Sequence, residues 1–141
     1  TRHIFKEGYL CLGNEFDEAR VCKNGISLKW FLDEILNPHL CREYVRDVMK
    51  EYPTGERSHG MEGLWESFYE IFSTNDKSEV INGLDIILIQ TPGRNNTCPC
   101  GSNMKYKNCH YKKASSVLEV GVNKAQEFYT RLKKHYNEIS Q

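Results

Sequence analysis

The chain is organised around the segment CPCGSNMKYKNCH, which spans residues 98–110. Its two ends supply three thiols and one imidazole, from Cys98, Cys100, Cys109 and His110. Four nitrogen and sulfur ligands of this kind hold zinc in a tetrahedron. Because protein ligands would take all four positions, the segment predicts one structural Zn²⁺ ion with no open position for water or substrate.

The remaining composition is that of an ordinary globular protein. The 141 residues are 39% hydrophobic and 27% charged, and no apolar run is long enough to span a membrane. Six cysteines are too dilute for a disulfide scaffold, and three of them lie in the lysine-rich segment 98–110. We therefore expect one domain, or one domain with a small appendage. No signal peptide is visible. The first residue is Thr1 rather than Met, so the chain could be a processed product or a fragment that a targeting segment precedes.

The charge is distributed unevenly along the chain. Residues 1–93 carry ten Lys and Arg against sixteen Asp and Glu, whereas residues 94–141 carry nine against three, so the formal charges are −6 and +6. A basic C-terminal half could contact nucleic acid, an acidic lipid or an acidic protein. It could equally face its own acidic neighbour. The cluster Lys105, Lys107, Lys112 and Lys113 has the same two interpretations, as a phosphate site or as a solvated rim.

Apolar spacing predicts a helix-rich chain with a short strand near its start. Residues 3–13 have no helical period and indicate a loop that enters a short strand, and residues 14–26 look like an exposed connection. The residues expected to face the core from the helix over 39–51 and its end are Leu40, Tyr44, Val45, Val48 and Tyr52. The expected helices are 27–36, which Asn37-Pro38 should end, then 39–51, 60–72 and 77–90, and one long amphipathic helix within 114–141.

Cys11 is the candidate nucleophile. It lies between Leu10 and Leu12, three residues after Gly8, and His3 is close in sequence. A thiol at the edge of a glycine turn can be exposed enough to attack a carbonyl carbon, with a nearby imidazole to move a proton. A buried cysteine that acts as a small hydrophobic residue fits the same pattern. The residues alone leave both interpretations open.

The metal segment resembles a known family. Gly93-Arg94-Asn95-Asn96-Thr97 before the first cysteine pair, and Lys105-Tyr106-Lys107-Asn108 before Cys109 and His110, are similar to the SEC-C motif at the C-terminus of the SecA translocation ATPase. Asn103-Met104 departs from the usual glycine and lysine, but no ligand is affected. The resemblance implies a bacterial cytoplasmic protein in which the zinc knuckle docks a partner.

A second resemblance covers the N-terminal part. His3, Gly8, Cys11 and Leu12, followed by a connection and a helix, are similar to the active-site stretch of ubiquitin-conjugating enzymes, and residues 55–60 add a Gly-Glu-x-x-His-Gly stretch seen in bacterial relatives. The resemblance implies that Cys11 carries a thioester and that His3 stabilises the oxyanion or positions the acceptor. It also implies an α+β, helix-rich fold, of which this chain is the C-terminal portion.

These resemblances give three expected regions and one function. Residues 1–93 would form a partial ubiquitin-conjugating-like domain, residues 94–113 the SEC-C zinc knuckle, and residues 114–141 a C-terminal amphipathic helix. The function would be acyl transfer by a ubiquitin-conjugating-like transferase. Bacterial relatives imply a role in antiphage defence, with the C-terminus of a nucleotidyltransferase that makes cyclic oligonucleotides as partner. The alternative is a zinc-binding adaptor without catalysis that binds protein or, less favoured, nucleic acid.

Other polar residues have ordinary explanations from sequence. His59 precedes Gly60 at an expected helix start, where capping and turn formation compete with a catalytic role. His39 should lie at the surface. Cys22 and Cys41 have no partner spacing and are expected to be buried or idle, although Cys22 could approach Cys11 and act in redox control. Trp30 and Trp65 fit helix faces and should be packing residues.

Overall fold

The structure, a computed structural model, describes residues 7–52 and 58–140. In these two ranges the chain is helical and contains no β-strand and no sheet. Isolated bridge residues occur at Leu10 and in the pair Thr97 and Lys105. The helices are α1 (Glu15–Cys22), α2 (Leu28–Trp30), α3 (Asn37–Met49), α4 (Gly60–Phe72), α5 (Lys77–Asp85), α6 (Tyr111–Leu118) and α7 (Val122–Ile139), with π-helical segments at Phe31–Leu36 and Ile86–Gln90 and a 3₁₀ turn at Tyr106–Asn108.

The expected α+β, ubiquitin-conjugating-like fold is therefore wrong. The predicted strand before Gly13 is reduced to a single bridge residue, Leu10, and no strand of the described residues lies beside it. Gly8, at φ +89°, turns the chain within this segment. The result is a loop rather than a strand.

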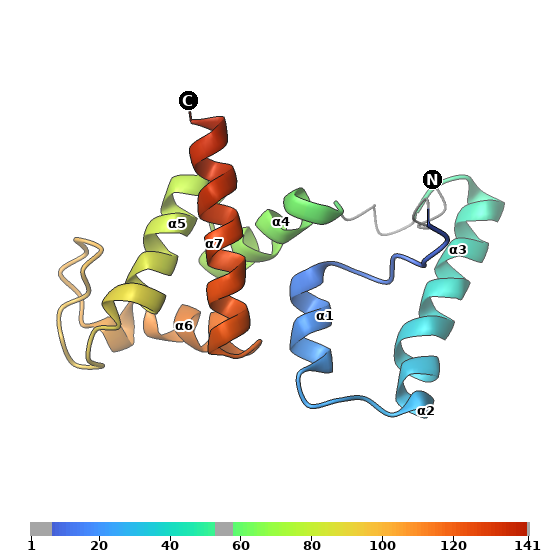
Figure 1. Ribbon diagram of the computed structural model, residues 1–141, viewed down its shortest axis with the longest axis horizontal. Coiled ribbons are helices and arrows are strands. Elements are labelled where there is room, and N and C mark those ends of the chain that lie inside the picture. Colours follow the sequence, from blue (N-terminus) through green and yellow to red (C-terminus); the bar gives the residue numbers. More distant parts are fainter. Residues whose placement is uncertain (1–6, 53–57, 141) are drawn as a thin grey trace.

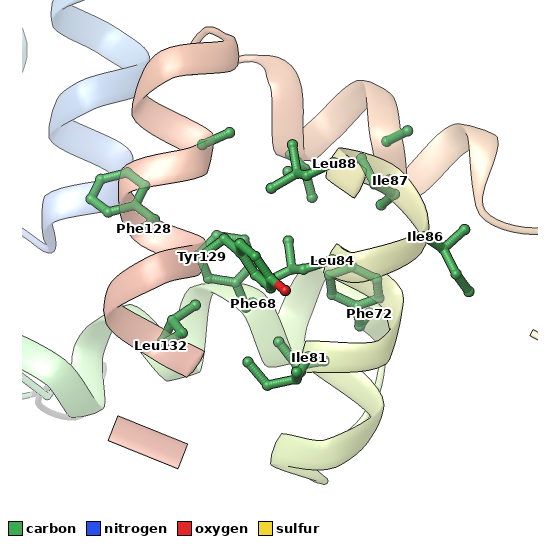
Figure 2. Close-up of a cluster of buried hydrophobic side chains, with 14 of the residues drawn as sticks. Phe68, Phe72, Ile81, Leu84, Ile86, Ile87, Leu88, Phe128, Tyr129 and Leu132 are labelled. Carbon is green, nitrogen blue, oxygen red and sulfur yellow. The ribbon is translucent and has the colours of Figure 1, made fainter. Parts of the chain in front are cut away.

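Four helices, α4 to α7, form the hydrophobic core of the molecule. α5, α6 and α7 gather around α4, and the side chains of Phe68, Leu84, Phe128 and Leu132 converge between them with no exposed surface (Figures 1 and 2). The helix over residues 60–72 begins and ends as the sequence predicted. The one predicted over 77–90 covers α5 and the π-helical segment that continues it.

The predicted exposed connection 14–26 instead contains α1. The Asn14 side chain caps this helix by accepting a hydrogen bond from the Asp17 N–H at 2.9 Å, and three acidic residues occupy its first turn. Phe16 then packs edge-on against Phe68, with ring centroids 5.2 Å apart. A single buried aromatic residue attaches α1 to α4, and one such residue gives too weak a period to detect from sequence.

Residues 28–49 form one continuous helix, so the predicted break at Asn37-Pro38 is wrong. The π-helical segment Phe31–Leu36 precedes the proline, and the Asn37 N–H bonds to the Leu32 carbonyl five residues back. The wider turn accommodates a residue that has no N–H of its own. This helix stands apart from the core, beyond α1 (Figure 1).

Three of the five residues expected to face the core from this segment are exposed, and the other two, Val45 and Tyr52, are half-buried. Leu40, Tyr44 and Val48 are 50%, 72% and 64% exposed. His39, predicted to lie at the surface, is buried instead. The period of the apolar residues is helical as predicted, but its direction relative to the core was assigned wrongly.

The single long C-terminal helix predicted within 114–141 is two helices. α6 ends at Leu118, and Gly121, at φ +87°, redirects the chain before α7 begins. L-residues rarely adopt that conformation, so the glycine determines the corner. α7 then buries Ala125, Phe128, Tyr129 and Leu132, while Val122 and Ile139 at its two ends are exposed.

An ion pair between α1 and α7 gives a prediction about pH. Arg131 donates from both terminal nitrogens to the Glu15 carboxylate, one bond being 3.0 Å, and this hydrogen bonding holds the pKa of Glu15 below its ordinary value despite partial burial. The stabilisation is therefore present above the ordinary glutamate pKa of 4.5 and is lost as the pH falls through the lower folded value.

Glu15→Gln should lower the free energy of unfolding by about 0.5–1 kcal/mol at pH 7, because the pair is partly exposed to solvent. The wild-type and variant curves should converge on acidification. Urea unfolding at several pH values measures this difference. A constant difference down to pH 3 would contradict the assigned role of the pair.

Candidate functional sites: a metal cluster and a thiol pocket

The four predicted metal ligands lie together. The donor atoms of Cys98, Cys100, Cys109 and His110 are all within 4.8 Å of one another. Cys109 Sγ is 3.4 Å from Cys100 Sγ and 3.2 Å from His110 Nδ1, and Cys98 Sγ is 3.3 Å from the same nitrogen. Zinc–sulfur bonds of about 2.3 Å in a tetrahedron place neighbouring sulfurs about 3.8 Å apart. The donor set and its spacing therefore fit zinc.

Tight turns bring the two ends of the segment together. The Cys98 N–H donates to the Met104 carbonyl at 2.8 Å, and the Cys109 N–H donates to the Tyr106 carbonyl at 3.0 Å. Gly101 and Asn103 adopt positive φ values of +81° and +57° at the reversal between these bonds. Glycine and asparagine tolerate this conformation at little cost. The backbone thus positions the ligands within a loop too short to have a core of its own.

The metal segment packs onto the helical core. Cys98 is 2% exposed, and the Phe72 and His110 rings lie 6.2 Å apart between centroids. Lys113 Nζ donates to the Phe72 carbonyl at 3.0 Å, which is the C-terminal end of α4. Lys113 is thus a contact within the chain rather than part of a free basic cluster. Tyr106 is also buried and belongs to the main hydrophobic core.

The environment shifts the pKa values of the metal ligands in different directions. Burial raises the pKa of Cys98 to about 11. Burial also acts to raise the pKa of Cys100, but hydrogen bonding with Ser102, Cys109 and Cys98 together outweighs it, and the pKa falls to about 7. Burial, helped by the nearby charge of Lys113, lowers the pKa of His110, which keeps its imidazole neutral as a metal ligand must be.

A second site lies at the start of the described chain. Cys11 is 8% exposed, and its Sγ is 3.1 Å from Nδ1 of His59, 48 positions later in the sequence. The carbonyl oxygen of Gly13 lies 3.6 Å from the same sulfur. The thiol therefore has an imidazole nitrogen within hydrogen-bond reach, which is the contact that a thiolate nucleophile requires. His3 lies outside the described residues.

The thiol and the imidazole line a cavity of about 340 Å³ between α1, the turn before it and the start of the helix over 28–49. Cys22 and Trp30 line the same cavity, and Trp30, which was predicted to be a packing residue, is 37% exposed. Cys22 and Cys41 are both exposed rather than buried. Trp65, in contrast, is fully buried as expected and donates its indole N–H to His135 Nδ1 at 3.0 Å.

The position of His59 depends on Gly63. Ser58, the preceding residue, is held by hydrogen bonds to Glu66 in α4, and a Cβ atom at Gly63 would lie 2.1 Å from the Ser58 backbone oxygen. Only glycine allows this approach. The N-terminal end of α4 thereby holds His59 against Cys11.

Gly63→Ala should displace the Ser58–His59 backbone, lower the free energy of unfolding by about 1–3 kcal/mol and slow alkylation of Cys11 by iodoacetamide. Gly83→Ala is a matched control, because its Cβ atom would meet the Phe72 ring at 2.1 Å, away from the thiol. It should destabilise the protein comparably without changing the alkylation rate. Equal alkylation of both variants would show that His59 does not depend on Gly63.

Comparison with known proteins identifies the metal segment. Residues 94–112 match the SEC-C motif, which confirms that part of the resemblance and makes this a zinc-binding motif. The protein translocase subunit SecA of Chlorobium limicola is 36% identical over 80 residues, which cover 53% of this chain and 8% of that protein. SecA of Chlorobium luteolum is 70% identical over 23 residues, or 16% of this chain and 2% of that protein.

These matches are local. The chain spans less than a tenth of the length of the SecA proteins that it matches. No solved structure matches it. The ubiquitin-conjugating resemblance gains no support from these comparisons. Within residues 7–52 and 58–140, none of the helices is long and apolar enough to cross a membrane.

Proposed function

We propose that this chain is a zinc-stabilised acyl carrier in which Cys11 forms a thioester and His59 is its proton acceptor. The observation that carries the proposal is the 3.1 Å contact between Cys11 Sγ and His59 Nδ1 at the wall of a cavity. His59 comes from a distant part of the chain, and its proposed role as proton acceptor differs from the oxyanion-stabilising or acceptor-positioning role that the resemblance implied for His3. The proposal does not require a ubiquitin-conjugating fold.

The chemistry takes two transfers. His59 Nδ1 accepts the thiol proton, the sulfur attacks the acyl carbon, and the leaving group of the donor departs with a proton. An amine then attacks the thioester carbon, the C–S bond breaks, and an amide forms while the Cys11 thiol is restored. A thiolate is both a good nucleophile and a good leaving group, so one difficult acyl transfer becomes two easier ones.

Zinc has a structural role in this proposal. Cys98, Cys100, Cys109 and His110 would hold a single ion, and a bound zinc supplies the stability that a short loop cannot obtain from its own core. The chemistry at Cys11 does not pass through the metal. The knuckle would present a firm surface to a protein partner, as proposed for a docking module.

The test compares intact masses of wild type, Cys11→Ser, His59→Ala and Cys41→Ser, purified with their neighbouring gene products. Wild type and Cys41→Ser should carry an adduct that hydroxylamine removes, since Cys41 is exposed and lies outside the cavity lining. Cys11→Ser should carry none, and His59→Ala should carry at least about tenfold less. An adduct that survives Cys11→Ser would overturn the proposal.

The partner and setting follow from the resemblance and are also proposals. The protein partner would be cytoplasmic, and the C-terminus of a nucleotidyltransferase in an antiphage operon is the first candidate. Coexpression of the two proteins, followed by mass analysis of both, tests this assignment. If the two proteins neither copurify nor form a joint adduct, the nucleotidyltransferase is excluded as the partner.

A non-catalytic adaptor is the second candidate, favoured by the exposed apolar row on the helix over 28–49. Leu40, Tyr44 and Val48 lie four residues apart and are each at least half exposed. An apolar surface of this kind is typical of a protein interface. In that case Cys11→Ser would have no effect on partner binding, whereas Tyr44→Glu would weaken it. Binding of nucleic acid by the basic half would instead show a steep dependence on salt.

A further inference from the structure

The cavity that contains Cys11 extends well beyond the thiol. Its volume of about 340 Å³ falls in the range of pockets that bind small molecules. The walls away from the sulfur are aliphatic and aromatic: Leu10, Val21, Ile26, Trp30, Phe31 and Ile35. A thiol that only exchanged a proton or a polar group would not need an apolar space of this size beside it.

We propose that this cavity holds the apolar chain of the acyl group that Cys11 carries. The inference rests on the proposed acyl transfer at Cys11 and adds the class of acyl group, a medium-length aliphatic chain. The carbonyl carbon would lie at Cys11 and His59, with the chain extending between α1 and the π-helical segment Phe31–Leu36. That direction is set by where the aliphatic and aromatic residues line the cavity.

The charges that line the cavity restrict the donor. Glu15, Asp17 and Glu18 on α1 are all acidic, and the lining includes no lysine or arginine among the described residues. The charge of Glu15 is balanced by Arg131, and Asp17 is bonded to Asn14 and Arg20. Glu18 is exposed and has no ion pair in the described part of the chain. This side of the cavity therefore disfavours an anionic donor and accepts a neutral acyl thioester.

The loading step exchanges one thioester for another. His59 Nδ1 accepts the proton of Cys11, the sulfur attacks the thioester carbon of the donor, and the donor's C–S bond breaks. The departing thiolate takes the proton from His59. One thioester is consumed and one is formed, so the step needs no oxidant or reductant. Burial of each chain methylene should favour loading by roughly fourfold, up to the length that the cavity holds.

The experiment uses neutral N-acetylcysteamine thioesters of octanoic and acetic acid and follows the adduct on Cys11 by intact mass. The octanoyl donor should load wild type at least about tenfold faster than the acetyl donor. Val21→Phe, which fills the cavity from α1, should remove this preference and leave acetyl loading in place. Leu28→Phe is the matched control, because Leu28 is 72% exposed and outside the lining, and it should keep the preference.

A second measurement separates the cavity from the chemistry. Octanamide and acetamide carry no leaving group, so they bind without acylating the thiol. Octanamide should protect Cys11 of wild type from iodoacetamide at concentrations where acetamide does not. This measurement needs no variant and therefore does not depend on how Val21→Phe folds.

The outcomes distinguish the two proposals. Equal loading by octanoyl and acetyl donors keeps the thioester and overturns the apolar-chain inference. Loading by neither donor, together with protection by octanamide, supports the apolar cavity and overturns the acyl-carrier function. Absence of protection by octanamide overturns the inference whatever the loading result is.

Discussion

Removal of zinc should unfold residues 94–113 and lower the melting temperature of the whole chain by more than about 10 °C. The reason is that the knuckle has few apolar residues of its own, while Cys98 and Tyr106 are buried within the main core. Loss of the metal leaves three thiols and an imidazole close together without a shared ligand. The backbone reversal at Gly101 then keeps only its backbone hydrogen bonds, and the packing of Phe72 against His110 should weaken with it.

Thermal unfolding with and without a strong chelator measures this effect, and native mass spectrometry counts the bound ions. Cys109→Ser should reproduce the effect of the chelator, whereas Cys22→Ser should not, because Cys22 is exposed and lies outside the metal cluster. Zinc affinity should fall as the pH falls, since thiolates and a neutral imidazole are the ligating forms. A chelated protein that melts at the same temperature as wild type would contradict a structural role for the metal.

The metal cluster could be predicted from the sequence because all four ligands lie close together along the chain. All four ligands lie within 98–110, and the proline, glycine and asparagine between them determine turns whose conformations depend little on the remaining chain. The helix over 60–72 was also predictable, because Leu64, Trp65, Phe68 and Phe72 repeat at helical spacing and all of them are buried. Local rules and tertiary packing agree in both regions.

Only one of the two residues of the thiol site could be predicted from the sequence. Cys11 could be named as a candidate, but its partner could not, because 48 positions separate it from His59 and no spacing rule joins them. The contact depends on the packing of α1 against α4, and little in the sequence beyond the helix cap indicated α1. Asn14 followed by acidic residues was the available signal. His39 was misplaced for the same reason, since burial outside a regular pattern depends on tertiary packing.

The fold class was predicted wrongly because a short sequence resemblance near Cys11 was taken to imply the whole fold of the ubiquitin-conjugating family. The residues near Cys11 resemble the active-site stretch of a helix-rich α+β domain, but a sheet needs at least two strands that pair, and the described residues contain none. The apolar row at Leu40, Tyr44 and Val48 shows the same limit. Helical spacing predicts that one face will be apolar, but it does not say what covers that face.

Phe68→Ala should lower the free energy of unfolding by about 3–5 kcal/mol and loosen α1 in particular. Phe68 has no exposed surface, and its ring meets Phe16 edge-on at 5.2 Å, while Phe16 also lies 6.0 Å from Phe128. The three rings join α1 to α4 and α7 around one point. Because α1 has Phe16 as its only buried residue, the cavity left by Phe68→Ala removes most of what attaches that helix.

The loosening of α1 also connects stability with the thiol site. α1 forms one wall of the cavity around Cys11, so Phe68→Ala should increase hydrogen exchange in residues 15–22 and expose Cys11 to iodoacetamide. Phe68→Leu should have the same effects at smaller size, because it fills part of the space. Tyr44→Ala removes an aromatic ring that is 72% exposed and should change stability by less than about 0.5 kcal/mol. If exchange in α1 stayed at the wild-type rate in Phe68→Ala, the three-ring contact could not be what holds the thiol cavity closed.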